Sequence, residues 1–354
     1  MVKMNKLPEV TSFNSDEMLC GPTRLVIVAE GFEPRSVYWT KLLHQEKYFL
    51  DAIICKYQPE KKSCLAELLP EVALRTFNAP LIVEFERVYP NKFEEQLLEL
   101  FKNISKYDEV VIDISVMSKL LIIIIISVIK DYGGMVKIIY SEPETYTPSL
   151  EEYNELKDVY GKPLKLPSYG VNDVVRTPLL SSIVMQRSPS IVIAFLSLNE
   201  QLIRALLSVV NPASLFLINA ISPNLLWRER AMAEIHDSII KEYANDNPVD
   251  ERGLLNKKTS TVFYQETFEL LASIYNQYCY SRRIIIAPTG SKMQALACAL
   301  IKVCCPDIHI EYPNPESYFI SDYSSSKIRM VHEVVIPRFK NTLYDIADSY
   351  RLNG

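Results

Sequence analysis

The feature that most constrains the fold is a segment that occurs twice in the chain. Residues 113–146 and 287–318 both run from a Ser-Lys pair, through an apolar stretch, to a strand ending in Tyr-x-x-Pro-Glu-(Thr/Ser)-Tyr. The matched positions are Ser118-Lys119 with Ser291-Lys292, Tyr140 with Tyr312, Pro143-Glu144 with Pro315-Glu316, and Tyr146 with Tyr318. The spacing from lysine to tyrosine is 21 positions in the first copy and 20 in the second. Such self-similarity predicts an internal duplication of one structural unit.

The sequence before each copy has the same order of elements. Short β-branched and apolar runs, typical of buried parallel strands, alternate with stretches of helical pattern. The expected strands of the first half are residues 24–29, 50–55 and 109–114, and those of the second half are 190–195, 213–219 and 283–287. The longer helical stretches before each third strand are residues 90–105 and 267–280. In each half the third strand leads directly into the Ser-Lys loop.

Strands that alternate with helices predict an α/β fold with parallel sheets and helices on both faces. We therefore expect two tandem Rossmann-like units with mainly parallel sheets, related by internal duplication. The first would comprise residues 1–160 and the second residues 190–354, with a connector at 161–189. The boundary falls in the stretch between Ser149 and Ser190, which is rich in Pro and Gly and lacks a long apolar period. Its inner part is expected to be a helix-poor connector or a swapped element.

Composition narrows the classes of function. The 354 residues are 48% hydrophobic and 23% charged, as in an ordinary globular protein, and the net charge of −5 argues against bulk attraction to nucleic acid. Seven cysteines without C-x-x-C spacing favour a reducing cytoplasm over a disulfide framework or a zinc site. The apolar run at residues 120–129 is half the length of a membrane span, so we expect a buried core segment and no membrane association.

The loop Ala287–Gln294 (APTGSKMQ) has the strongest functional signal. Pro288 and Gly290 shape a turn at a strand end, and Thr289, Ser291 and Lys292 supply donors at an expected helix start, where backbone amides and the helix dipole favour anions. The loop therefore has the character of a phosphate or nucleotide cradle, although neither the P-loop nor the G-x-G-x-x-G pattern is present. The alternative interpretation is an ordinary helix N-cap, which needs no ligand.

The counterpart loop in the first half, residues 113–119 (DISVMSK), follows the equivalent strand. Both loops keep a lysine, Lys119 or Lys292, which capping does not require and which the positive end of a helix disfavours. Two lysines at such positions favour an anionic ligand.

The order of strand, polar Thr/Ser-Gly-Ser/Thr-Lys loop and apolar helix resembles CARF domains (CRISPR-associated Rossmann fold) and the related SAVED sensors of prokaryotic antiviral systems. In that superfamily the loops after the first and a later strand bind cyclic or linear oligonucleotides. The resemblance implies a sensor of a nucleotide-derived ligand that regulates a separate effector or acts through an oligomer. The residues it implicates are Thr289, Gly290, Ser291 and Lys292, with Ser115, Ser118 and Lys119 as weaker equivalents, and the loops 30–36 and 197–201. Val116 and Met117 depart from the pattern where a glycine would be expected.

Catalysis is the competing interpretation of the first half. Glu30, Glu33 and Asp113 follow expected strands and could converge with Arg35 as a carboxylate cluster that binds a metal or acts as a general base. The simpler interpretation, which the pattern favours, is a salt-bridged loop in which Arg35 orders Glu33 or Asp113. The four histidines, His44, His236, His309 and His332, are scattered and show no metal-binding spacing, so we expect no metal site.

Three functions remain open. The chain could bind a nucleotide or oligonucleotide as a regulatory sensor, act as a nucleotide-processing enzyme of hydrolase or nuclease type, or be a scaffold subunit of a defence complex without a ligand. A protein partner or a homo-oligomer is expected, and no cofactor. The paired tyrosines Tyr140 and Tyr312 could stack on bases at the strand ends or pack against the fold.

Overall fold

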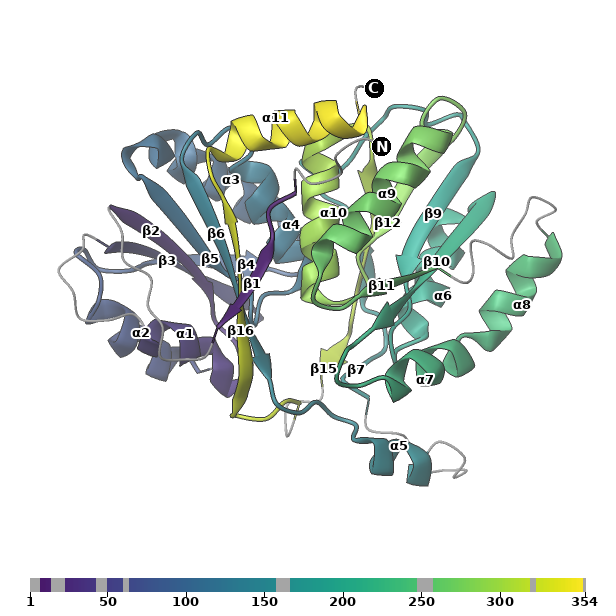
Figure 1. Cartoon of the computed structure of the whole chain (residues 1–354), viewed down its shortest axis with the longest axis horizontal. Coiled ribbons are helices and arrows are strands. Elements are labelled where there is room, and N and C mark those ends of the chain that lie inside the picture. The colour runs from purple at the N-terminus through teal and green to yellow at the C-terminus, as the bar shows by residue number, and fades with distance from the viewer. Residues whose placement is uncertain are drawn as a thin grey trace. The chain divides into compact units, whose positions relative to one another are not determined.

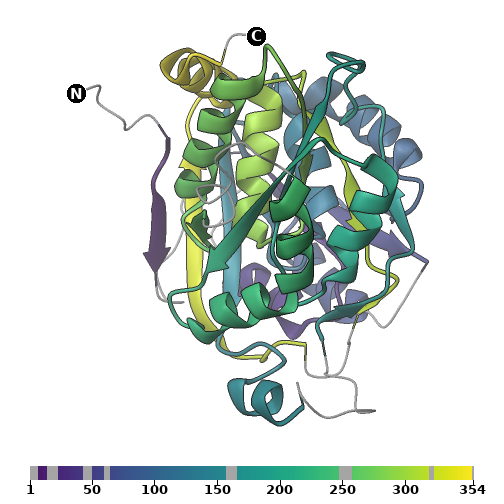
Figure 2. The ribbon, with the colours of Figure 1, turned by 90° about the vertical axis from the view of Figure 1, so that its right-hand side faces the viewer.

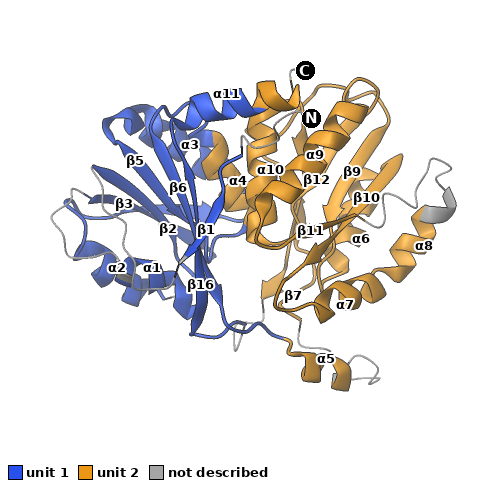
Figure 3. Cartoon of the chain, in the orientation of Figure 1, with its two compact units in different colours: residues 1–118, 128–147, 320–346 blue, residues 119–127, 148–319, 347–354 orange. Residues whose placement is uncertain are grey.

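The structure is a computed structural model that describes residues 7–13, 23–42, 50–59, 64–156, 166–246, 257–318 and 323–352. The chain forms two compact units, coloured separately in Figure 3. The first comprises residues 1–118, 128–147 and 320–346, and the second comprises residues 119–127, 148–319 and 347–354. Cys20 and His44 lie outside the described residues.

The first unit is built on a seven-stranded sheet in the order β1-β16-β6-β5-β2-β3-β4. Its strands are β1 (Val10–Phe13), β2 (Arg24–Ala29), β3 (Leu50–Gln58), β4 (Leu81–Glu86), β5 (Glu109–Asp113), β6 (Met135–Pro143) and β16 (Ile328–Ile336). The five strands from β6 to β4 are parallel, whereas β16 pairs antiparallel with β6 and β1 pairs antiparallel with β16. Figure 2 shows β1 running beside the long strand β16.

The helical segments of the first unit are η1 (Pro34–Val37), α1 (Tyr38–Leu42), α2 (Leu65–Ala73), α3 (Asn91–Leu100), η2 (Phe101–Lys106) and most of α11 (Phe339–Tyr350). On one face of the sheet, alternate residues such as Val26, Val28 and Ile54 pack with Trp39 of α1 and Leu68 of α2 in a buried cluster. A second contact joins a strand to α3, where the rings of Phe85 and Phe93 meet edge to face. Both faces therefore bury apolar residues, as a parallel sheet requires.

The second unit contains a five-stranded sheet in the order β11-β10-β9-β12-β13, with every pair parallel. Its strands are β9 (Ser190–Phe195), β10 (Ser214–Ile221), β11 (Lys258–Ser260), β12 (Arg283–Ala287) and β13 (His309–Ile310). Two short antiparallel ladders join β14 (Tyr312–Asn314) to β8 (Asp173–Val175) and β15 (Ser317–Tyr318) to β7 (Ser168–Tyr169).

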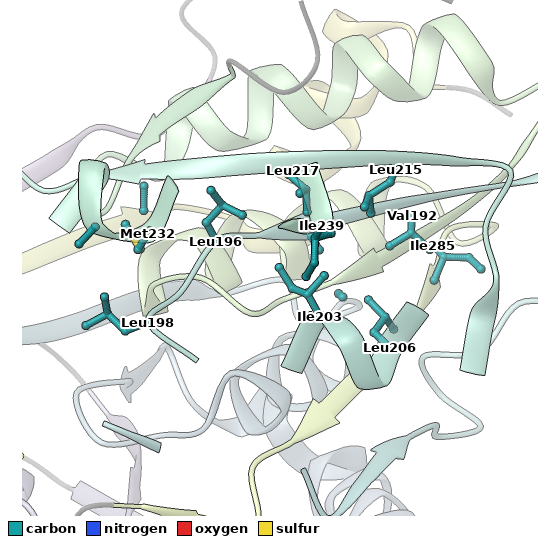
Figure 4. Close-up of a cluster of buried hydrophobic side chains, with 14 of the residues drawn as sticks. Val192, Leu196, Leu198, Ile203, Leu206, Leu215, Leu217, Met232, Ile239 and Ile285 are labelled. Atoms are coloured by element: carbon teal, nitrogen blue, oxygen red, sulfur yellow. The ribbon is translucent and has the colours of Figure 1, made fainter. Parts of the chain in front are cut away.

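The helices of this unit are α4 (Lys119–Val128), α5 (Leu150–Leu156), α6 (Gln201–Val210), α7 (Trp227–Ile235), α8 (Asp237–Asp246), α9 (Tyr264–Tyr278) and α10 (Lys292–Cys304). Alternate strand residues such as Val192, Leu217 and Ile285 pack with Ile203 of α6 and Met232 of α7 in the buried cluster of Figure 4. On the opposite face Phe216 of β10 meets Tyr278 of α9. Figure 1 shows α9 and α10 on the side of this sheet away from α6.

The expected α/β architecture, mainly parallel sheets flanked by helices, is confirmed. All six strands expected from the apolar runs form at or within three residues of the expected bounds. Residues 120–128 of the apolar run lie in the buried helix α4, and no helix of the described residues is long and apolar enough to cross a membrane. The parallel parts of the two sheets also share one connectivity: β4-β3-β2-β5-β6 and β11-β10-β9-β12-β13 both follow the order third, second, first, fourth, fifth.

The division of the chain differs from the expected one at residue 160 and residue 190. The segment expected to connect the units carries β7 and β8, which pair with strands of the second unit, and its described residues contain no helix. Conversely, β16 follows the second unit in sequence but extends the first sheet beside β6. Thus β8, which follows the first sheet in the sequence, pairs in the second unit, and β16, which follows the second sheet, pairs in the first unit. The sequence did not predict this, because β7 and β8 are too short to show an apolar period and the pairing of β16 with β6 joins distant segments.

Candidate functional site

The strand order places a switch point in each parallel sheet, where the chain leaves one edge for the other. It lies between β2 and β5 in the first sheet and between β9 and β12 in the second. In open α/β sheets the carboxyl ends of the strands at this point form the usual ligand crevice. The loops singled out from the sequence, residues 30–36 and 114–118 in the first unit and 197–201 and 288–291 in the second, follow these four strands.

In the first unit the loop after β2 contains a buried ion pair. Arg35, which is 1% exposed, donates from Nε and Nη2 to the two carboxylate oxygens of Glu33 at 2.9 and 3.0 Å. It also donates from Nη1 to the backbone oxygen of Ser141 in β6 at 3.0 Å, and the Ser324 hydroxyl donates to Glu33 at 2.6 Å. The salt-bridged loop that the sequence favoured is therefore present, with Glu33 as the partner of Arg35.

Two tyrosines of the first repeat surround this guanidinium. The ring centroids of Tyr140 and Tyr146 lie 5.8 and 5.9 Å from Cζ of Arg35, and their hydroxyls are 2.5 Å apart. Burial disfavours the charged form, but Glu33 and then Tyr146 and Tyr140 raise the pKa of Arg35 well above its ordinary value. Tyr140 is buried and also stacks on His332, so in this unit the packing role of the tyrosine is the one observed.

Asp113 at the end of β5 belongs to a second part of the same network. Its Oδ1 accepts the amide of Ser115 at 2.9 Å and the hydroxyl of that serine, and the hydroxyl in turn accepts the amide of Ser141 at 2.8 Å. The loop after β5 is thus tied to β6 by hydrogen bonds. Ser118 at the end of this loop donates its amide to the hydroxyl of Tyr57 at 2.6 Å.

The third candidate carboxylate, Glu30, is 3% exposed, and its Oε2 has no hydrogen-bond partner among the described residues. Nowhere in the described ranges do three His, Cys, Asp or Glu residues gather in a way that could hold a metal ion. The candidate catalytic residues Glu30, Glu33 and Asp113 therefore do not form a metal-binding group, and Glu33 is engaged by Arg35.

In the second unit the loop after β12 forms a capping box. Ser291 caps α10: its hydroxyl accepts the amide of Gln294 at 3.1 Å, and the side chain of Gln294 accepts the amide of Ser291 at 2.7 Å. Gln294 also donates to the Thr259 hydroxyl at 2.9 Å, and Ser291 donates to the backbone oxygen of Thr261 at 3.0 Å. The loop is thereby tied to the end of β11.

Thr289 holds the same loop against the first strand of this sheet. Its hydroxyl donates to the backbone oxygen of Phe195 at 2.6 Å and accepts the amide of that residue at 2.9 Å. Gly290 comes so close that an added Cβ would lie 2.1 Å from Oε1 of Gln294 and 2.9 Å from Cβ of Phe195. Glycine is required here by close approach.

The lysines stand at the first residues of two helices. Lys292 opens α10 and Lys119 opens α4, and both are half-buried. Burial lowers the pKa of Lys119 to about 8, and a nearby anion would reverse this shift.

The sequence predicted the positions of the loops and the types of their residues. It did not predict the hydrogen-bond partners Tyr57, Ser141, Ser324 and Thr259, because each of them comes from a distant element.

Comparisons with known proteins add no assignment. No family model matches the chain, and no curated protein is significantly similar to it.

Proposed function

We propose that this chain binds a nucleotide-derived anionic ligand through its strand-end loops, with the loop Pro288–Lys292 of the second unit as the principal contact. One observation carries the proposal: α10 begins with Lys292 at the end of this loop, which is hydrogen-bonded to β9 through Thr289 at the switch point of the sheet. The positive end of a long helix and a lysine charge then coincide where α/β sheets commonly bind phosphates. Gly290 and half-buried Ser291 lie in the same loop.

We further propose that both units bind such a ligand, as related copies of one structural unit. The identical order of the five parallel strands, the repeated Ser-Lys and Tyr-x-x-Pro-Glu segments, and the reciprocal strand contributions of β8 and β16 support an internal duplication. Lys119 would be the equivalent of Lys292. The similarity to CARF and SAVED sensors extends this to a role in antiviral defence, with the ligand regulating a separate effector in the cytoplasm.

The test is calorimetric titration of the intact protein with inorganic phosphate, ATP, a cyclic dinucleotide, and short linear and cyclic oligonucleotides. Lys292→Met removes the charge and keeps the length of the side chain, and Lys241→Met removes an exposed lysine of α8 as the matched control. We expect a roughly tenfold or larger loss of affinity in the first variant only, as for loss of one charge-assisted contact. Equal affinity in both variants would contradict the assignment, and analysis of the mixtures for products distinguishes a sensor from an enzyme.

A scaffold without a ligand is the second candidate, and a specific observation favours it. The side chains of Thr289, Ser291 and Gln294 all have hydrogen-bond partners within the unit, so the loop is satisfied without a bound anion. If no member of the panel binds to the intact protein, the scaffold is the better interpretation.

A further inference from the structure

Exposed apolar side chains are concentrated in one short part of the first unit. Of the fifteen large apolar residues that are exposed in the described part of the chain, seven lie within residues 74–100. They are Leu74, Phe77, Leu81, Ile82, Tyr89, Leu98 and Leu100. Single exposed apolar residues need no explanation, but four of these seven, Leu81, Ile82, Tyr89 and Leu100, line one hollow, and such a contiguous group marks an interaction surface.

This segment contains the end strand of the seven-stranded sheet. β4 pairs with β3 on one side and has no neighbour on the other among the described strands. Val83 and Phe85 point into the core, whereas Ile82, Glu84 and Glu86 alternate with them and are exposed. An end strand of this kind presents unpaired backbone groups to a further strand.

The free edge borders a groove of about 500 Å³. One wall consists of β4 residues from Leu81 to Glu86, and the other consists of α3 residues that include Tyr89 just before the helix, Phe93 and Leu100. A second hollow of about 350 Å³ shares Leu81 and Leu100 with the first and continues it past the start of the strand. The first hollow follows β4, and the second lies at the starts of β3 and β2, beside Asp51 and Leu25.

The charges along this groove are mainly acidic. Glu84, Glu86 and Glu99 line the first hollow, and Lys92 is its one basic residue within the described part of the chain. In the second hollow Asp51 is already paired with Lys106. The acidic side chains that the edge presents are Glu84, with Lys56 of β3 opposite it, and Glu86, with Gln58 opposite it, two positions apart on one face of the strand.

We propose that β4 is a docking edge for a partner protein segment that adds as a further strand, with apolar residues alternating with lysine or arginine. Side chains of an added strand alternate between the two faces of the sheet. Those on the α3 side would lie against Leu81, Phe93 and Leu100, and those on the other side would lie beside Glu84 and Glu86, where opposite charges stabilise cross-strand pairs. Backbone hydrogen bonds supply affinity in this mode of recognition, and alternate side chains supply selectivity.

A second copy of this chain fits the edge less well. Antiparallel pairing of β4 with itself around its centre would bring Glu84 and Glu86 of both copies into one short ladder, where like charges repel. The acidic edge therefore selects a basic strand over self-association.

The test uses the full chain and a fluorescein-labelled peptide of alternating leucine and lysine, as long as β4, with fluorescence anisotropy as the readout. A leucine-glutamate peptide is the charge control. The variant Glu84→Lys/Glu86→Lys reverses the edge, and Glu155→Lys/Glu242→Lys makes the same change of net charge on two exposed residues of α5 and α8. Two further lysine peptides are N-methylated on all leucine or on all lysine amides, which blocks one edge of the peptide or the other.

We expect the lysine peptide to bind the wild type and the Glu155/Glu242 variant, and to bind the edge variant roughly tenfold or more weakly. The edge variant should instead prefer the glutamate peptide, and one of the two N-methylated peptides should lose binding while the other keeps it. Equal binding by all variants, or retention by both N-methylated peptides, would overturn the proposal. Dimerisation of the wild type in light scattering that the edge variant abolishes would also overturn it, in favour of a self-interface.

Discussion

Replacing Arg35 with leucine should destabilise the first unit severely. The guanidinium makes two hydrogen bonds to Glu33 and one to the backbone oxygen of Ser141, all of 2.9–3.0 Å and all buried. Its removal leaves Glu33, a 6% exposed carboxylate, with the hydrogen bond from the Ser324 hydroxyl. Removing one partner of a buried ion pair typically costs about 3–5 kcal/mol, because the other charge stays buried without compensation.

The assay is urea unfolding followed by the fluorescence of one tryptophan. The chain has two, the buried Trp39 of α1 and Trp227 of α7, so a Trp227→Phe background reports on the first unit alone. In this background Arg35→Leu should lower the free energy of unfolding by about 3–5 kcal/mol. The matched control Lys102→Leu removes an exposed pair with Glu99 in the same unit and should cost less than about 0.5 kcal/mol.

A double variant separates lost packing from stranded charge. Glu33→Gln/Arg35→Leu removes the uncompensated carboxylate and should recover a large part of the stability that Arg35→Leu loses, roughly 2 kcal/mol. If Arg35→Leu costs no more than Lys102→Leu, the buried hydrogen bonds of Arg35 do not stabilise the first unit, and the prediction is wrong. A double variant as unstable as the single one would show instead that the cost comes from packing of Tyr140 and Tyr146 on the guanidinium.

Three other changes test separate contacts. Gly290→Ala should destabilise the second unit by about 1–3 kcal/mol, since the new Cβ would lie 2.1 Å from Oε1 of Gln294, and Trp227 fluorescence in a Trp39→Phe background measures this. Thr289→Val leaves the amide of Phe195 without its acceptor and should cost about 1–3 kcal/mol in the same assay, against near neutrality for Ser208→Ala on the exposed face of α6. Burial would raise the pKa of Glu142, but the hydrogen bond from His332 and the charge of Arg329 lower it on balance. The ionised carboxylate of Glu142 therefore stabilises the first unit fully above its unfolded-state pKa of about 4.3. The difference in free energy of unfolding between wild type and Glu142→Gln should close as pH falls through the lower folded-state pKa. A difference that does not depend on pH would contradict this.

The parallel strands could be predicted from the sequence because each is a continuous apolar run buried on both faces. β2 and β9 are examples, with nearly every residue buried. β4 was missed since its alternating pattern, exposed on one face, is that of an edge strand, and β16 was assigned to the second half because pairing of distant segments leaves no local signal. At the candidate site the loop residues were predictable, but their hydrogen-bond partners come from elements up to 291 positions away, as Ser324 does for Glu33.

The sequence pattern places a glycine in the loop after β5 of the first unit, where Val116 and Met117 stand instead. The packing at the two switch points explains this departure. In the second unit Gly290 of the fourth-strand loop packs on Phe195 at the end of the first strand, and in the first unit Gly31 after the first strand packs on Val116 of the fourth-strand loop. An added Cβ would lie 2.9 Å from the partner side chain in either case, so the close approach of the two loops is kept while the small residue has changed sides. In a pair of residues that pack against each other, the small and the large residue can swap positions while the total volume of the pair stays the same. The departure at Val116 from the Thr-Gly-Ser-Lys pattern is therefore compatible with a duplicated unit, and Gly31→Ala should destabilise the first unit as Gly290→Ala destabilises the second.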